Sequence, residues 1–120
     1  MTTPRRRWRM YRTSSGSSPV REFLAALDDD AATAIAAAMR DVAIEGLGAA
    51  RHLRGEIYEV RASGDRQAFR VLFANEGRRG QILLGLEAFS KKTQRTPPPK
   101  IALAERRLQD WRTRGRLSHR

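Results

Sequence analysis

The hydrophobic period of the chain changes at residue 56, and this change restricts its possible folds more than any other feature. Three later segments, 57–61, 68–74 and 81–89, are rich in β-branched and aromatic residues, and short polar stretches that contain glycine separate them. Alternation with a period of two indicates strands, and such separating stretches indicate hairpin loops. The sequence therefore predicts an antiparallel meander of three strands, whose apolar row needs a layer of helices to cover it.

Helical spacing occurs both before and after the meander. Apolar residues recur at i, i+3, i+4 and i+7 over 20–27, directly after Ser18 and Pro19, which favour a helix start. An alanine-rich run as far as Glu45 predicts a second helix, and the apolar spacing over 101–111 predicts a last one. These helices can supply the layer that the meander requires.

A short strand expected over 7–12 completes the order of elements, which is strand, helix, helix, three strands, helix. This order predicts an α+β domain in which an antiparallel sheet carries its helices on one face. A chain of 120 residues with 40% hydrophobic residues can form one modest core. We therefore expect a single domain over 1–120, with flexible ends at 1–6 and 113–120.

The charge of the chain predicts a polyanionic partner. Lysine and arginine number 24 against 13 aspartate and glutamate residues, and the formal net charge is +11. Cysteine is absent and the two histidines lie far apart in the sequence, so we expect no disulfide, no metal site and no cofactor. No apolar run is long enough to span a bilayer, and no signal-peptide core follows the arginine-rich start. We expect a cytoplasmic protein that does not associate with membranes.

Alternation along the meander gathers charged residues on one face of the sheet. Phe69, Val71 and Phe73 form an apolar row that we assign to the helix-covered face, so Arg70 points to the other, open face. The same alternation puts four further residues on this open face: Glu59, Arg61, Glu87 and Phe89. In the third strand it puts three apolar residues on the opposite face: Leu84, Leu86 and Ala88. The pair Lys91 and Lys92 follows at the rim.

Two interpretations of the charged face remain open. Arginine side chains form paired hydrogen bonds with phosphate oxygens and an exposed Phe89 can stack on an unpaired base, so the face suits RNA. Cross-strand ion pairs on a solvated sheet face, such as Arg61 with Glu59 or Glu87, produce the same pattern without a function. The adjacent lysine pair favours the functional interpretation.

A family resemblance involves the same residues. The segments 20–24, 53–61 and 69–73 resemble the phage-derived HigB-like branch of the RelE/ParE superfamily of type II toxin–antitoxin toxins. The run over 89–97, Phe-Ser-Lys-Lys-Thr-Gln-Arg-Thr-Pro, is the specific part of this resemblance. The resemblance implies a RelE-like fold and an mRNA interferase, an endoribonuclease that cleaves mRNA on the ribosome and inhibits translation. It also implies a cognate antitoxin, HigA-like and with a helix-turn-helix domain.

Carried over by position, the resemblance implies an active site that contains Arg61, Arg70, Phe89, Lys91 and Lys92. RNA can be cleaved without a metal when its 2′-hydroxyl attacks the adjacent phosphate, provided that the protein orients the attack and stabilises the anionic transition state. We expect Arg61 and Arg70 to hold the phosphate. The lysine pair would stabilise the transition state or protonate the leaving oxygen, and Glu87 or Glu59 would act as the base. Four residues are expected to contact RNA: Arg54, Glu59, Phe89 and Arg95.

Two other functions are compatible with these residues. Toxins of the ParE type share the implied fold but poison DNA gyrase and do not cleave RNA, and a fold does not determine a function. A nucleic-acid-binding protein without catalysis would explain the charge but not the motif over 89–97. The cluster around Arg70 favours RNA cleavage over both.

Overall fold

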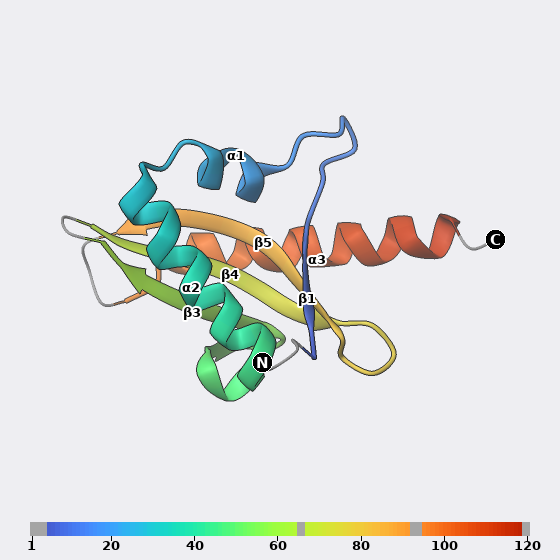
Figure 1. Cartoon of the computed structure of the whole chain (residues 1–120). Coiled ribbons are helices and arrows are strands. Elements are labelled where there is room, and N and C mark those ends of the chain that lie inside the picture. The colour runs from blue at the N-terminus through green and yellow to red at the C-terminus, as the bar shows by residue number, and fades with distance from the viewer. Residues whose placement is uncertain (1–4, 65–66, 92–94, 119–120) are drawn as a thin grey trace.

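The computed structural model describes residues 5–64, 67–91 and 95–118. Figure 1 shows the elements in chain order: β1 (Arg7–Met10), α1 (Pro19–Ala25), α2 (Asp29–Glu45), the 3-10 helix η1 (Leu47–Ala49), β2 (Arg51–Arg54), β3 (Ile57–Ser63), β4 (Ala68–Glu76), β5 (Ile82–Lys91) and α3 (Pro98–Ser118). The predicted α+β class is confirmed. The predicted meander corresponds to β3, β4 and β5.

The five strands form one sheet in the order β1-β5-β4-β3-β2. The meander strands and β2 pair antiparallel, whereas β1 pairs parallel with β5. The sheet is therefore mixed, and the expectation of an antiparallel sheet is wrong at β1. Strand β2 is also missing from the prediction, because three of its four residues are arginine or histidine and it shows no apolar alternation.

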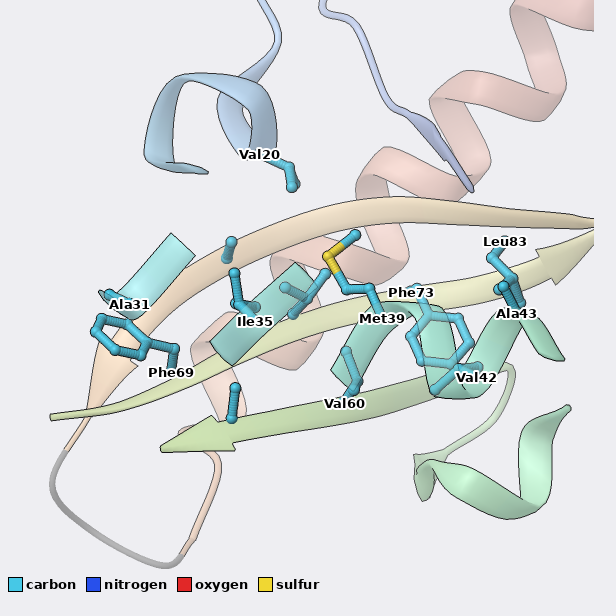
Figure 2. Packing of buried hydrophobic residues seen from close by; sticks show 13 residues of the cluster. Val20, Ala31, Ile35, Met39, Val42, Ala43, Val60, Phe69, Phe73 and Leu83 are labelled. Atoms are coloured by element: carbon cyan, nitrogen blue, oxygen red, sulfur yellow. The ribbon is translucent and has the colours of Figure 1, made fainter. Parts of the chain in front are cut away.

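Helices α1 and α2 cover one face of the sheet. Asp28 begins α2 by accepting a hydrogen bond from the Ala31 amide at 2.8 Å, and Gly46 ends this helix with a φ of 94°. Figure 2 shows the buried side of α2 against the apolar row of β4 that contains Phe69 and Phe73. The predicted row is thus the face that these two helices cover.

Helix α3 covers the opposite face, behind the sheet in Figure 1. The expectation that all helices lie on one face is wrong, because β4 is apolar on both faces: Leu72 and Ala74 are as deeply buried as Val71 and Phe73. Three residues of α3 pack over this second apolar set: Ile101, Ala104 and Leu108. The helix continues over 113–118, where the sequence predicts a flexible end. No helix in the described part of the chain is long and apolar enough to cross a membrane.

A β-bulge in β5 changes which face its residues occupy. Leu72 pairs with Glu87 and Phe73 pairs with Gly85, so Leu86 is one extra residue in β5. Leu84, Leu86 and Phe89 consequently lie together on the α3 face, and Ala88 lies on the other. The predicted grouping of Leu84 and Leu86 with Ala88 is wrong, because an extra residue shifts the alternation by one position.

Candidate functional site

Three residues singled out from the sequence form one row across the sheet. Arg61 of β3 pairs with Arg70 of β4, and Arg70 pairs with Phe89 of β5. Side chains at paired positions lie on the same face of a sheet. The fold therefore brings together residues that are up to 28 positions apart in the sequence (89 − 61 = 28).

Glu59 connects the two arginines of this row. It precedes Arg61 by two positions in β3, and its Oε1 accepts a hydrogen bond from Arg61 Nε at 2.5 Å. Its Oε2 lies 3.9 Å from Arg70 Nε and also accepts a hydrogen bond from the Thr96 hydroxyl. Because the Glu59 side chain is fully buried, its charge acts at low dielectric and orients both guanidinium groups.

Arg70 is buried beneath the segment that leads into α3. The residue is 2% exposed, and its Nη1 lies 3.4 Å from the Thr96 hydroxyl oxygen, to which it donates. Burial lowers the pKa of Arg70 from its ordinary value, and the charge of Glu59 opposes this effect. The expectation of an open sheet face is therefore wrong at Arg70, because the residue is buried and contacts Thr96, just before α3. Arg61 stays accessible, with 32% of its side chain exposed.

A pocket of about 400 Å³ opens beside Arg61, and we call it the Arg61 pocket. It is lined by four arginines and four other residues: Arg51, Arg54, Arg61, Arg95, Leu53, Thr96, Pro98 and Ile101. Two of these arginines, Arg54 and Arg95, were expected to contact RNA. Arg54 also forms an ion pair of 2.7 Å with Glu105, so one carboxylate partly offsets the charge of the pocket.

Two polar residues of the Arg61 pocket, Arg51 and Thr96, were not among the site residues predicted from the sequence. Arg51 lies on β2, where it pairs with Glu59, and an undetected strand could not place it. Thr96 belongs to the run over 89–97, so that motif contained the signal, but its contacts with Glu59 and Arg70 depend on the tertiary fold. Both residues complete the surroundings of the two site arginines.

Glu87 lies apart from the arginine row. Its carboxylate forms ion pairs with Lys100 at 3.0 Å and with Arg107 at 3.3 Å, both from α3. Leu72 separates Glu87 from Glu59 in the register, which corresponds to two strand spacings or about 10 Å. The structure therefore brings Glu87 to α3 and not to Arg61 and Arg70.

The remaining predicted residues lie at the end of β5. Phe89 is 8% exposed and the Lys100 ammonium group lies 5.2 Å from the centre of its ring, so the ring is covered instead of presented for stacking. Lys91 ends β5, where its backbone pairs with Ala68. Lys92 lies outside the described residues.

Comparison with known proteins assigns the chain to a family. The family model described as phage-derived Gp49-like protein matches residues 22–109, a range that contains the whole Arg61 pocket. The chain belongs to this family. The Gp49-like chain is also 36% identical over 109 residues to proteins named probable endoribonuclease HigB1 from two strains of Mycobacterium tuberculosis, a match that covers 88% of this chain and 84% of each relative. The predicted resemblance to HigB-like proteins is confirmed.

The candidate site of this Gp49-like protein is a basic pocket backed by one buried carboxylate. In the ranges that the structure describes, no three histidine or acidic side chains gather closely enough to hold a metal ion. Arg61 belongs to both parts of the site, since it contacts Glu59 and also lines the pocket. Such an arrangement can bind a phosphate group and present a preorganised cation to charge that develops on it.

Proposed function

We propose that this protein is the toxin of a type II toxin–antitoxin pair, an endoribonuclease that acts in the cytoplasm and cleaves mRNA on the ribosome. The observation that carries this proposal is the Arg61 pocket, in which a buried Glu59 orients an accessible arginine. The relatives named probable endoribonuclease HigB1 support the same activity. We further propose a HigA-like antitoxin with a helix-turn-helix domain as the partner.

The proposed reaction is an attack of the RNA 2′-oxygen on the adjacent phosphorus. The 2′-hydroxyl releases its proton to water, a 2′,3′-cyclic phosphate forms, the bond from phosphorus to the 5′-oxygen breaks, and the leaving oxygen takes up a proton. Arg61 binds the phosphate and stabilises the additional negative charge of the transition state. Arg70 is buried and acts indirectly, through its contacts with Glu59 and Thr96. Lys91 and Lys92 supply further positive charge or the proton for the leaving oxygen.

Neither carboxylate is assigned to proton abstraction in this proposal. Glu59 accepts hydrogen bonds from Arg61 and Thr96, and these contacts suit a residue that positions the arginines. Glu87 is engaged by two cations of α3 and suits the docking of that helix. The sequence predicted that Glu59 or Glu87 would act as the base. We propose instead that both residues position other side chains.

The test is primer extension on a translated message in the presence of the wild-type protein or of Arg61→Gln. We expect the wild type to cleave within translated codons and Arg61→Gln to cleave on the order of a hundredfold more slowly, because one preorganised donor to the transition state is lost. Arg106→Gln is the matched control, since Arg106 is exposed on α3 and outside the Arg61 pocket.

Three outcomes would contradict the proposal. DNA breaks that depend on gyrase, without loss of mRNA, would instead indicate a ParE-like poison. RNA binding without cleavage would indicate a nucleic-acid-binding protein. Cleavage that a chelator abolishes while the ribosomes stay intact would reject the metal-independent mechanism.

A further inference from the structure

A second basic pocket lies at the opposite edge of the sheet. Its volume is about 380 Å³, and it is lined by four arginines, two tryptophans and one methionine: Trp8, Arg9, Met10, Arg12, Arg21, Trp111 and Arg114. Strand β1 stands at one end of the strand order and β2, which lines the Arg61 pocket, stands at the other. We call this second site the β1-edge pocket, and neither the sequence motifs nor the proposed reaction accounts for it.

The β1-edge pocket has an excess of positive charge. Arg114 forms an ion pair of 2.8 Å with Asp110. Across the described ranges, Arg9, Arg12 and Arg21 form no ion pair with a carboxylate. By contrast, Arg107 and Arg112 elsewhere on α3 both pair with glutamate side chains. The charge of this pocket is therefore available for an anionic ligand.

The exposed edge of β1 adds backbone donors to the pocket. The amides of Arg7 and Tyr11 donate to carbonyl oxygens next to and within β5, at 2.8 and 2.9 Å. Successive amides of a strand alternate in direction, so those of Trp8 and Met10 point away from β5. No strand in the described part of the chain pairs with that side of β1, and both residues line the pocket.

An aromatic platform completes the site. The Arg9 guanidinium lies 5.0 Å from the centre of the Trp111 ring, so the flat group of β1 is held over the flat ring of α3. Nucleobases stack on aromatic rings and on guanidinium planes, and this contact accepts any base. The N–H groups of arginine side chains and of backbone amides can donate hydrogen bonds to the oxygens of a phosphate.

We propose that the β1-edge pocket binds single-stranded RNA, with Arg9, Arg12 and Arg21 on phosphates and a base stacked at the Arg9–Trp111 pair. The inference rests on the proposed function, since it gives the same RNA a second point of attachment outside the cleavage site. Residues of α3 line both pockets, and Ile101 and Trp111 are ten residues or about 15 Å apart along the helix. About five nucleotides of a stacked strand, at roughly 3.4 Å each, span this distance.

The same features disfavour an extended peptide as the ligand. Strand β1 is four residues long, and two of these residues are arginine. Short edge strands that carry charged side chains resist pairing with another strand. Three guanidinium groups without a carboxylate partner in the described ranges, those of Arg9, Arg12 and Arg21, beside an aromatic platform therefore point to RNA.

The test measures the affinity for a fluorescent twelve-nucleotide RNA whose 2′-O-methyl groups prevent the attack on phosphorus. We expect the double variant Arg9→Gln/Arg21→Gln to bind at least about tenfold more weakly than the wild type. The slope of log affinity against log salt should fall by about 1.4 in magnitude, because each phosphate contact to a single strand contributes about 0.7. Thermal denaturation verifies that the variant is folded, as expected for two exposed residues.

The matched control is Arg78→Gln/Arg79→Gln, which removes two exposed charges from the turn between β4 and β5. We expect this control to change the affinity by less than about twofold. An equal loss in both double variants would overturn the inference, because only total charge would then matter. Preferential binding of polyglutamate over RNA would also overturn it, since the ligand would then be an acidic polypeptide.

The two proposals can fail separately. If the wild type cleaves mRNA on the ribosome but RNA affinity does not depend on Arg9 and Arg21, the inference fails and the proposed function stands. If no cleavage occurs but the affinity depends on these two arginines, the proposed function fails and the RNA site stands.

Discussion

At the scale of single residues, Glu59 determines how the charged face is organised. The two interpretations left open by the sequence, a phosphate-binding cluster and a cross-strand ion pair, apply to the same side chains. Arg61 is paired with Glu59 and also lines the basic pocket, whereas Arg70 is buried with the same carboxylate. The ion pairs therefore form part of the site, because they hold the arginines in a defined orientation.

The burial of Arg70 leads to a prediction about stability. We expect Arg70→Ala to lower the free energy of unfolding by about 3 kcal/mol, because breaking a buried ion pair leaves a desolvated charge behind. Arg61→Ala should lower the free energy of unfolding by less than half as much. The Arg61 side chain is 32% exposed, and Glu59 retains its contacts with Arg70 and Thr96 in that variant. Urea denaturation of both variants measures the difference. An Arg70→Ala protein as stable as the wild type would show that Glu59 does not depend on this partner.

At the scale of elements, α3 holds the site closed and is joined to the sheet by ion pairs. Arg112 bonds to Glu56, directly before β3, at 2.7 Å and to Glu76, the last residue of β4, at 2.8 Å. Lys100, near the start of α3, and Arg107, at its middle, bind Glu87. These contacts position the segment at Thr96 that covers Arg70.

The contact between Arg112 and Glu56 predicts a dependence on pH. Hydrogen bonding from Arg112 lowers the pKa of Glu56 below its ordinary value of 4.5. The pair therefore contributes its full stability above pH 4.5 and loses it as the pH falls through the lower pKa of the folded state. We expect Arg112→Gln to be destabilised by about 1 kcal/mol at neutral pH, with a difference that shrinks on acidification.

Urea denaturation at neutral and acidic pH measures this effect. Arg106→Gln is the control, because Arg106 is exposed on the same helix and forms no ion pair with a carboxylate in the described ranges. A constant difference between Arg112→Gln and the wild type down to low pH would rule out the role of the Glu56 carboxylate.

The end of α2 provides a second prediction at this scale. Gly46 has a φ of 94°, and an added Cβ would lie 3.0 Å from an Nη atom of Arg6. We expect Gly46→Ala to destabilise the protein by about 1–2 kcal/mol, because left-handed backbone is strained for residues with a Cβ. Gly48→Ala, two positions later, has no atom within 4 Å of the added Cβ and should cost less. Thermal denaturation measures the stability of both variants. A Gly48→Ala protein less stable than Gly46→Ala would contradict the prediction that the backbone conformation at Gly46 requires glycine.

At the scale of the whole molecule, one sheet separates two apolar clusters. Phe73 belongs to the cluster under α1 and α2, and Leu72 belongs to the cluster under α3. Neighbouring residues of β4 thus contribute to both clusters. Because the two share every central strand, we expect them to unfold in one cooperative transition.

Two tryptophans allow this cooperativity to be tested. Trp8 packs against the first cluster and Trp111 against the second, so Trp111→Phe and Trp8→Phe each leave one reporter. We expect Phe73→Ala to cost about 3–5 kcal/mol and to shift the transition of both reporters equally. A shift seen by Trp8 but not by Trp111 would show that the two faces unfold independently.

Local patterns in the sequence were sufficient to predict most of the elements. Helical spacing identified α1 and α3, the alanine-rich run as far as Glu45 identified α2, and alternation identified β1 and the meander. These signals could be recognised because each depends on residues within a few positions of one another. The row of Arg61, Arg70 and Phe89 was predictable for the same reason, since a hairpin brings alternating positions of adjacent strands together.

Only the tertiary structure decided how these elements enclose the site. The parallel pairing of β1, the strand β2 and the placement of α3 on the second face depend on partners far away in the chain. One extra residue at Leu86 shifted the alternation of β5, and the tertiary fold buried Arg70 against Glu59 and Thr96. Alternation defines two faces of a strand, but which face is covered depends on the apolar area that all strands expose together.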